Sequence, residues 1–585
     1  MPWHSLLQSL LSRGMSDSSI HGKRIQIIIA AVAIAGALIV IRLFYLQVIH
    51  VKDYRARAER QYVTPNSNIF DRGAIYFTSK DGTTVAAATI QNGFKVSINP
   101  TLVTDPNSAY KDLNDVIPSD LTSFLNDVAK KNQPYEKIAT HLNSDQAATL
   151  SADKIPGFTI TADKWRYYPG GSLAAKAIGF VSFSNDKLVG NYGLEQSYND
   201  VLSRSGSAFY VNFFAEIFAN IQSSIFKNNT STGDVVTSIE PTVQAQLEQE
   251  VAGIQSKWSA QSVGAIVMDP YTGAIIAMAQ VPTFDLNNYG AEKDPSIYTN
   301  PLVQSDFEMG SIIKPLIMGA AIENHVVTPQ TTYDDKGFAI VGGKTIYNFD
   351  KVGRGPNTPM QTVLDDSLNT GMVFVEQHMG QAMFKDYIEN RYKLGQKTGI
   401  DLPGEINGLM SSLNGSNDVN YATAAFGQGI ATTPISIVRS FNVLANGGYL
   451  VTPHVATSII EQDGTVKPLI YPKSDTPLLS PSTIATMQTM LTHVVDDGYH
   501  RRQIHYTVAA KTGTAQIAMP GGGGYYNDRN LHSMVGFFPA TNPKYLLYFY
   551  DYYPKNILYS IQTLGDPFFN MVQFMENYYN IPPDR

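Results

Sequence analysis

A serine followed three residues later by a lysine, Ser311 and Lys314, is the first arrangement in this sequence that could carry out chemistry. At that spacing both side chains lie on one face of a helix, about one turn apart. The lysine is flanked by Ile313 and Pro315, and a partly desolvated lysine can lose its proton and act as the base for a nearby hydroxyl. The pair therefore indicates nucleophilic catalysis by serine.

The Ser-x-x-Lys pattern is weak by itself, and only its context distinguishes Ser311. The same pattern also begins at Ser108, Ser151, Ser184 and Ser224. At Ser311 it follows a glycine and lies inside an apolar run, where a lysine is costly unless it has a task or a partner. We expect Ser311 at the N-terminal end of a buried helix. The alternative is a lysine whose charged end extends to solvent.

Two further short motifs follow along the chain. Ser367-Leu368-Asn369 offers a hydroxyl and an amide on a short turn, and Lys511-Thr512-Gly513-Thr514 ends the strand-like run Val508-Ala509-Ala510. A strand with an exposed edge can bind an extended peptide through main-chain hydrogen bonds, and a glycine lets the peptide come close. Because lysine and threonine side chains suit a carboxylate, the strand is a candidate binding site for substrate.

Both motifs have competing copies. Ser-x-Asn also begins at Ser97, Ser197, Ser412 and Ser440. A second Lys-Thr-Gly, Lys397-Thr398-Gly399, is followed at once by Asp401-Leu402-Pro403-Gly404, a sequence typical of a loop. We predict that this second copy lies in a loop and is not the site.

The elements that would position these motifs lie in residues 241–585. Apolar strands are predicted at 263–268 and 274–279 around a turn at 269–273, and again at 508–517, 534–538 and 545–550. Asp566-Pro567 resembles an N-cap followed by a first-turn proline, which predicts a last helix from there to about Tyr579. A sheet assembled from both ends of this region, with helices between, predicts a mixed α/β catalytic domain.

The N-terminus predicts a membrane anchor. Residues 25–41 are apolar except for Gln26, and the apolar run resumes up to residue 49. Basic side chains precede it, so the positive-inside rule places residues 1–24 in the cytoplasm and the chain after the 25–49 span outside. The alternative is a cleaved signal peptide, because Ala35-Gly36-Ala37 resembles a cleavage site.

Length and composition narrow the class of protein. With 585 residues the chain is long enough for two or three domains. Its formal net charge of −7 gives no basic excess, so nucleic acid is not an expected partner. Because the chain has no cysteine, disulfides, thiolate zinc sites, iron–sulfur clusters and cysteine nucleophiles are excluded.

The order Ser-x-x-Lys, Ser-x-Asn, Lys-Thr-Gly-Thr resembles that of the penicillin-recognising serine enzymes. Other blocks are similar to the transpeptidase domain of that family, namely 269–279, 394–405, 426–434 and 535–539. Three upstream blocks resemble the pedestal of class B penicillin-binding proteins, namely 72–82, 166–171 and 193–198. Met309, Ile312 and Ile313 depart from the usual family residues around the serine.

The resemblance implies a single N-terminal transmembrane helix, an elongated α+β pedestal of the dimerisation type at 50–240, and a transpeptidase domain at 241–585 whose central antiparallel sheet is flanked by helices. It implies a monofunctional peptidoglycan D,D-transpeptidase in the cytoplasmic membrane, with the catalytic domain outside and no metal or cofactor. Its partners would be peptidoglycan stem peptides, β-lactams and a separate membrane glycan polymerase. Glu308 and the 398–405 block favour cell division over elongation.

The resemblance also implies roles for single residues. Ser311 would attack the D-Ala-D-Ala carbonyl, Lys314 would take its proton, and Ser367 with Lys511 would return a proton to the leaving group. Asn369 would bind a substrate amide and position Lys314. The remaining expected contacts to substrate come from the strand motif. The backbone N–H groups of Thr514 and Ser311 would form an oxyanion hole, and the side chains of Thr512 and Thr514 would hold the carboxylate. Gly513 would let the substrate come close to the strand.

Three alternatives remain open at this point. A D,D-carboxypeptidase or β-lactamase would hand the acyl group to water. A catalytically silent β-lactam-binding scaffold would keep the fold without turnover. An elongation-type transpeptidase would share the whole mechanism and differ in where it acts.

Overall fold

The computed structural model describes Gly36 and residues 72–184, 187–203, 232–521 and 523–585. Apart from Gly36, the predicted cytoplasmic tail and the predicted anchor at 25–49 lie outside the described residues. Within the described ranges, no helix combines the length and the apolar character needed to cross a bilayer. The segment Asn68–Arg585 forms one compact unit, and the account below concerns its described part.

The predicted catalytic domain at 241–585, called the catalytic half below, is built on a five-stranded sheet whose order is β16-β17-β18-β8-β9. The strands are β8 (Ser262–Met268), β9 (Ile275–Val281), β16 (Ala509–Ala518), β17 (Tyr525–Phe538) and β18 (Tyr545–Tyr552). Every neighbouring pair is antiparallel. The expectation of a central antiparallel sheet drawn from both ends of the region is confirmed, and the Lys-Thr-Gly-Thr strand β16 lies at its edge.

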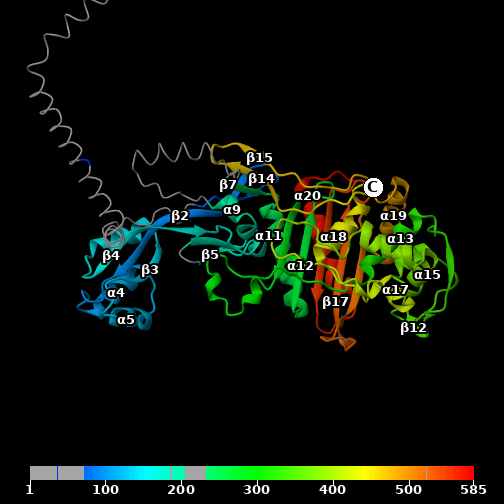
Figure 1. Cartoon of the computed structure of the whole chain (residues 1–585), viewed down its shortest axis with the longest axis horizontal. Coiled ribbons are helices and arrows are strands. Elements are labelled where there is room, and N and C mark those ends of the chain that lie inside the picture. Colours follow the sequence, from blue (N-terminus) through cyan, green and yellow to red (C-terminus); the bar gives the residue numbers. More distant parts are fainter. Residues whose placement is uncertain (1–35, 37–71, 185–186, 204–231, 522) are drawn as a thin grey trace, which may run out of the picture. The chain divides into compact units, whose positions relative to one another are not determined.

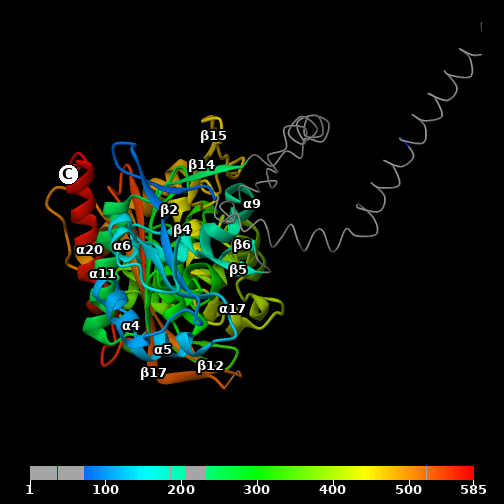
Figure 2. The same cartoon turned by 90° about the vertical axis from the view of Figure 1, so that its left-hand side faces the viewer.

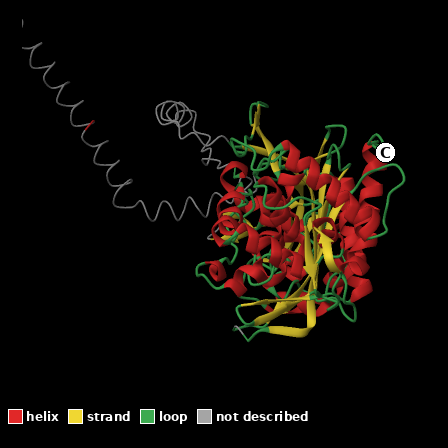
Figure 3. Ribbon diagram, turned by 90° about the vertical axis from the view of Figure 1, so that its right-hand side faces the viewer, coloured by secondary structure: helices red, strands yellow, loops and turns green. Residues whose placement is uncertain are grey.

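Two long helices, α11 (Pro241–Trp258) and α20 (Ser560–Tyr579), cover one face of this sheet and lie side by side (Figure 2). Their apolar stripes meet the sheet in one buried cluster, in which Leu247 and Phe568 pack with Val263 and Phe549. Burial of such apolar surface is the main favourable term in folding. Helices lie on both sides of the strands (Figure 3), so the catalytic half is a layered α/β structure.

The last helix begins earlier than predicted. It starts at Ser560, so Pro567 lies inside the helix and not at its first turn. An internal proline removes one backbone hydrogen bond and costs about 3 kcal/mol. Leu564 lies before the proline, and Phe568 and Met571 follow it, all of them fully buried against the sheet. Their packing outweighs the local penalty, which is why the local signal gave the wrong start.

The other face of the sheet is covered by a helical layer centred on α13 (Lys314–Glu323). Eight consecutive residues of α13 are buried, Lys314 to Ala321, as expected for a helix that is apolar on all sides. It packs against α15 (Asn369–Met379), α18 (Pro434–Phe441) and α19 (Pro481–His493). The helix that follows Ser311 is therefore buried, as predicted.

The N-terminal half contains a second sheet of order β15-β14-β7-β1-β2-β3, with β4 also paired to β2. Its strands are β1 (Ile75–Thr78), β2 (Thr84–Ile98), β3 (Glu136–Leu142), β4 (Phe158–Tyr167), β7 (Gly233–Thr237), β14 (Ala456–Glu461) and β15 (Val466–Pro468). Two of them, β14 and β15, come from the catalytic half. The second sheet therefore joins the two halves of the chain.

Three helices complete the N-terminal lobe, α4 (Pro106–Val116), α5 (Leu121–Ala129) and α6 (Ser144–Ala152) (Figure 1). They pack with β2, β3 and β4 around a small separate core that includes Val96, Leu113, Phe124 and Leu142. The described part of residues 50–240 thus has the α+β character that the resemblance implied.

Shorter elements connect these layers. In the N-terminal half they are α7 (Ala175–Ile178), β5 (Phe180–Ser184), β6 (Lys187–Asn191), α8 (Gly193–Ser197) and α9 (Asn199–Leu202). In the catalytic half they are α12 (Pro301–Gln304), β10 (Thr332–Asp335), β11 (Phe338–Val341), β12 (Lys344–Tyr347), β13 (Gly355–Pro359), α14 (Met360–Asp365), α16 (Gln381–Lys385) and α17 (Asp418–Ala424).

The three upstream blocks singled out in the sequence meet at one buried carboxylate. Glu195 is fully buried and accepts from Arg72 Nε at 2.6 Å and from Arg166 Nε at 2.7 Å. Arg166 also donates to Gly73 O at 2.7 Å. Residues far apart in the sequence thus share one ion-paired network that holds the start of the described chain against α8.

Candidate active site

Ser311 lies in a short 3₁₀ turn, Gly310–Ile313, that leads directly into α13. The turn approaches β16 so closely that a Cβ on Gly310 would lie 3.0 Å from Thr514 O, and Gly310 itself has a φ of +62°. Glycine is the residue that tolerates both constraints. Ser311 is partly exposed, whereas Lys314, three residues later, is completely buried.

The buried amine of Lys314 makes three hydrogen bonds, all to neutral groups. It donates to Ser367 O at 2.6 Å, to Asn369 Oδ1 at 2.9 Å and to Ser367 Oγ at 3.3 Å. Burial lowers the pKa of Lys314 well below its ordinary value, and the positive charge of Lys511 lowers it further. The sequence had predicted the desolvation, and the geometry makes Lys314 a candidate neutral base.

Lys511 reaches the same point from β16. Its amine is fully buried and donates to Ser367 Oγ at 3.1 Å and to Thr512 O at 3.1 Å. Burial lowers the pKa of Lys511 to about 7, although the nearby carboxylate of Asp365 acts in the opposite direction. The Ser367 hydroxyl therefore lies between two buried amines, and burial lowers the pKa of each of them.

Ser367 and Asn369 occupy the turn between α14 and α15. Ser367 has a φ of +53°, a left-handed conformation that costs a residue other than glycine about 1–2 kcal/mol. Asn369 is the first residue of α15, and its Nδ2 donates to Tyr347 O at 3.0 Å while its Oδ1 accepts from Lys314. The amide thus holds the lysine without supplying a negative charge.

Two residues that the sequence analysis did not identify contact the strand motif. Tyr499 OH lies 3.0 Å from Thr512 Oγ1 and accepts from Thr512 N at 2.7 Å. Ser560 Oγ lies 2.6 Å from Thr514 Oγ1. Tyr499 and Ser560 stand outside every recognised motif, so no signal in the sequence could have found them. Both hydroxyls of the predicted carboxylate site are therefore already oriented by neighbours.

Gly513 lies where β16 passes the serine turn. A Cβ at this position would come within 2.6 Å of Met309 O and 2.5 Å of Ser533 Oγ. Only a residue without a side chain permits this approach. The glycine predicted for close approach of the substrate is thus also required by the packing of the protein.

The competing copies of the motifs lie elsewhere. Ser108, Ser151 and Ser184 belong to α4, α6 and β5 in the N-terminal half, and Ser224 lies outside the described residues. Lys397-Thr398-Gly399 forms a loop, as predicted, in which Thr398 and Gly399 donate their backbone N–H groups to Glu405 at 2.6 and 3.0 Å.

Two known protein families match this chain. Residues 263–555 match the family described as Penicillin binding protein transpeptidase domain, and residues 70–237 match the Penicillin-binding Protein dimerisation domain. Stage V sporulation protein D of Bacillus subtilis is 30% identical over 495 residues, which cover 83% of this chain and 75% of the relative. The chain belongs to the penicillin-binding protein transpeptidase family. The resemblance seen in the sequence is confirmed.

Other penicillin-binding proteins are similar over much of their length. Peptidoglycan D,D-transpeptidase FtsI of Buchnera aphidicola subsp. Baizongia pistaciae is 26% identical over 580 residues, covering 96% of both chains. The structure of penicillin binding protein 3 of Mycobacterium tuberculosis in complex with aztreonam superposes with a TM-score of 0.63 at 27% identity, covering 72% of this chain and 92% of that chain. Penicillin Binding Protein 2X of Streptococcus thermophilus shares the fold, with a TM-score of 0.68 at 21% identity over 88% of this chain and 80% of that chain.

The departures from the usual penicillin-binding protein residues are buried beneath the serine turn. Met309, Ile312 and Ile313 are each at most 2% exposed and belong to the main apolar core. Met309 O accepts from Ser533 Oγ at 3.0 Å. These side chains therefore fill the core under the site and remove none of the polar groups described above.

The described ranges contain no group of three or more His, Asp or Glu side chains arranged to hold a metal ion. The polar atoms that converge on the site are hydroxyls, amines and one amide, the donor set of serine acyl transfer.

Proposed function

We propose that this protein is a peptidoglycan D,D-transpeptidase that cross-links stem peptides through an acyl-enzyme on Ser311. One observation carries the proposal: the Ser367 hydroxyl lies within 3.3 Å of the buried amine of Lys314 and within 3.1 Å of that of Lys511. A hydroxyl between two amines of lowered pKa can pass a proton in either direction. Acyl transfer needs one proton removed from the nucleophile and one delivered to the leaving amine.

In the first half-reaction Ser311 Oγ attacks the carbonyl between the two terminal D-alanines. The neutral amine of Lys314 takes the hydroxyl proton, and the new ester bond forms as the peptide C–N bond breaks. Ser367 gives its proton to the leaving D-alanine amine and is reprotonated from the lysine side. In the second half-reaction an amine of a neighbouring stem peptide attacks the ester, and the new peptide C–N bond forms as the acyl C–O bond to Ser311 breaks. The proton that the amine loses returns to Ser311 Oγ.

The remaining substrate contacts are part of the same proposal. The backbone N–H groups of Ser311 and Thr514 would bind the oxyanion, because the serine turn and β16 approach closely at Gly310. Thr512 and Thr514 would hold the terminal carboxylate at the free edge of β16. A β-lactam would acylate Ser311 by the same route, and no cofactor takes part.

An acceptor-transfer assay tests this function against its nearest alternatives. Purified protein with a D-Ala-D-Ala donor peptide and an amine acceptor is expected to release D-alanine and form the transfer product in equal amounts. Release without transfer would contradict the proposal and indicate a carboxypeptidase. The absence of both release and β-lactam acylation would indicate a silent scaffold.

We further propose that residues 25–49 anchor the protein in the cytoplasmic membrane, with residues 50–240 as a pedestal below an extracytoplasmic catalytic domain. Protease added to spheroplasts would then digest the chain beyond residue 50, and a mature N-terminus at Leu38 or later would contradict the anchor.

A separate membrane glycan polymerase would be the partner. We place the enzyme at the division septum, so its depletion should give filaments, whereas round cells would indicate an elongation role.

A further inference from the structure

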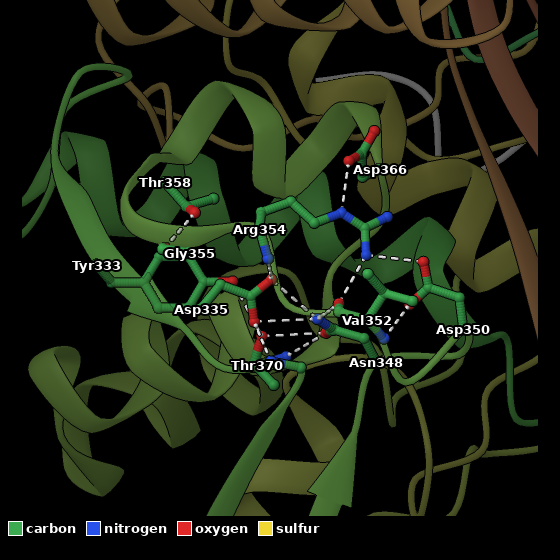
Figure 4. Close-up of polar contacts among 11 residues, drawn as sticks. Tyr333, Asp335, Asn348, Asp350, Val352, Arg354, Gly355, Thr358, Asp366 and Thr370 are labelled. Carbon is green, nitrogen blue, oxygen red and sulfur yellow. Dashed lines mark hydrogen bonds and ion pairs between the residues drawn. The ribbon is translucent and has the colours of Figure 1, made fainter.

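A small lobe formed by residues 332–359 packs against α14 and α15, the helices on either side of Ser367. Figure 4 shows its polar contacts with Asp366 and Thr370. The lobe contains the β10–β13 pair and the β11–β12 hairpin. The helix α15, which begins at Asn369, receives no capping hydrogen bond from the side chain of its own N-cap residue, Leu368. The first N–H groups of α15 have no partner within the helix, so they depend on side chains from elsewhere.

Asp335, at the end of β10, supplies a buried carboxylate close to that helix end. It is 1% exposed and accepts from Thr370 Oγ1 at 2.8 Å, from the backbone N–H groups of Gly337 and Arg354 at 3.0 Å each, and from Asn348 Nδ2 at 3.1 Å. No Lys, Arg or His side chain of the described residues pairs with it. Neutral donors alone satisfy this charge, which lies near the positive end of α15.

Asn348 completes the cap. Its Oδ1 accepts from Thr370 N at 3.1 Å and lies 3.0 Å from Thr370 Oγ1, while its Nδ2 donates to Asp335. Thr370 is the second residue of α15 and follows Asn369 directly. The preceding residue of the lobe, Tyr347, accepts from Asn369 Nδ2 through its carbonyl. Two consecutive residues of the lobe thus hold two consecutive residues of the helix.

The same lobe also holds the chain on the other side of Ser367. Arg354, whose backbone N–H donates to Asp335, donates through Nε to Asp366 Oδ2 at 2.9 Å and through Nη1 to Asp350 Oδ2 at 2.7 Å. Asp366 is the residue before Ser367. The left-handed Ser367 is therefore fixed between two attachments, and both attachments meet at Asp335.

We infer that Asp335, Asn348 and Thr370 are positioning residues for the reaction, which hold Ser367 and Asn369 at hydrogen-bond distance from the two lysine amines. The inference rests on the proposed function. None of the three residues is within hydrogen-bond distance of Ser311, Lys314 or Lys511, so they act through the turn and not on the substrate. A cap that served only stability would leave the reaction of the folded protein unchanged.

Substitution of Thr370 in the full-length protein separates these two roles. Thr370→Val keeps the shape of the side chain and removes its hydroxyl, whereas Thr370→Ser keeps the hydroxyl. The second-order rate constant for acylation by a fluorescent penicillin is measured across pH 6–10 for folded protein. We expect Thr370→Val to acylate at least tenfold more slowly with an altered pH profile, and Thr370→Ser to recover most of the rate.

Thr237→Val is the matched control, because Thr237 is also fully buried and donates to Tyr76 O at 2.9 Å in the second sheet. It should lower stability and leave the acylation rate and pH profile unchanged. Asp335→Asn gives a second test if Thr370→Val does not fold, with the same slowing expected. If folded Thr370→Val or Asp335→Asn showed the wild-type rate and pH profile, the positioning inference would be overturned and the proposed function would stand. A wild-type protein that is never labelled at Ser311 would overturn the proposed function as well.

Discussion

Two buried ammonium groups without a paired carboxylate define the site at the scale of single residues. Lys314 and Lys511 are each completely buried, and their hydrogen-bond acceptors are hydroxyl, carbonyl and amide oxygens. Moving a charged amine into such surroundings is unfavourable, so the neutral form of each gains population. The same burial that costs folding free energy thus populates the neutral amine that the proposed reaction needs.

Asn369→Asp tests the importance of neutral acceptors. A carboxylate 2.9 Å from Lys314 Nζ would favour the charged lysine, and its second oxygen would face Tyr347 O, which the amide nitrogen now contacts at 3.0 Å. We expect acylation by β-lactam to slow at least about tenfold at pH 7, with partial recovery at higher pH. Equal acylation rates for wild type and variant at pH 7 would show that the charge at this position is irrelevant.

The buried Lys511 also predicts how stability changes with pH. Its folded pKa of about 7 lies below the ordinary value of 10.5, so between these values the unfolded chain binds the additional proton. Stability from this group therefore rises with pH, by about 2–3 kcal/mol between pH 6 and 9. The unfolding free energy of the wild type should therefore rise by that amount relative to that of Lys511→Met over this pH range.

Denaturant unfolding at several pH values measures this difference. The control is Lys397→Met, which changes the exposed lysine of the second Lys-Thr-Gly copy. It should show no such growth. A pH-independent difference for Lys511→Met would mean that Lys511 is charged in the folded protein throughout the range.

The candidate catalytic residues were predicted from the order of three short motifs and from the family that this order resembles. Ser311, Lys314, Ser367, Asn369 and Lys511 belong to short motifs whose order is distinctive. In the structure, hydrogen bonds link Lys314 to Ser367 and Asn369, and a further one links Ser367 to Lys511. The supporting residues could not be predicted in this way. Asp335, Asn348 and Tyr499 are single polar residues in connecting segments, and only tertiary folding gives them their partners.

At the scale of elements, the site depends on how closely the serine turn lies against the edge strand β16. A side chain on Gly513 would come within 2.6 Å of Met309 O, a distance that backbone atoms cannot accommodate without moving. We expect Gly513→Ala to destabilise the fold by about 1–3 kcal/mol and to slow acylation at least about tenfold, because the turn and strand would separate.

The control for this variant is a glycine with free space around it. Gly253 lies within α11, and a Cβ there would meet no atom within 4 Å. Gly253→Ala should stabilise the protein by about 0.5–1 kcal/mol through helix propensity and leave acylation unchanged. Thermal unfolding and penicillin labelling of both variants measure these changes in stability and acylation. Normal acylation by folded Gly513→Ala would refute the claim that the site depends on this close approach.

The elements themselves were predictable to different degrees. The five strands of the catalytic sheet follow from apolar runs bounded by turn residues, and four of them lie within two residues of their predicted places. The exception is β17, which was predicted to begin at residue 534 and begins at Tyr525. The start of α20 was wrong, because the local signal of Asp566-Pro567 was overruled by packing of the preceding turn on the sheet. The pairing of β14 with β7, across the predicted boundary at residue 240, also depends on contacts between distant segments.

At the scale of the whole molecule, the buried Glu195 network is the expected weak point of the N-terminal half. Glu195→Gln would leave Arg72 and Arg166 buried without a counter-charge. Removing one partner of a buried ion pair costs about 3–5 kcal/mol. Denaturant unfolding should show this loss, whereas Glu389→Gln in the more exposed pair with Lys385 should cost less than about 1 kcal/mol.

Folded Glu195→Gln should still be acylated at the wild-type rate, since the network does not contact the catalytic groups. Loss of acylation in the folded variant would mean that the N-terminal half controls the site directly. A stability equal to that of wild type would mean that the two arginines have other partners.

The central claim is that Ser311 is the nucleophile and that the two buried lysines serve it. Reaction with a fluorescent penicillin, followed by proteolysis and mass mapping of the modified peptide, tests it most directly. We predict one adduct, on Ser311, that is absent from Ser311→Ala and unaffected by alanine at Ser108, Ser151, Ser184 or Ser224. An adduct on another residue, or labelling that survives in Ser311→Ala, would contradict the account.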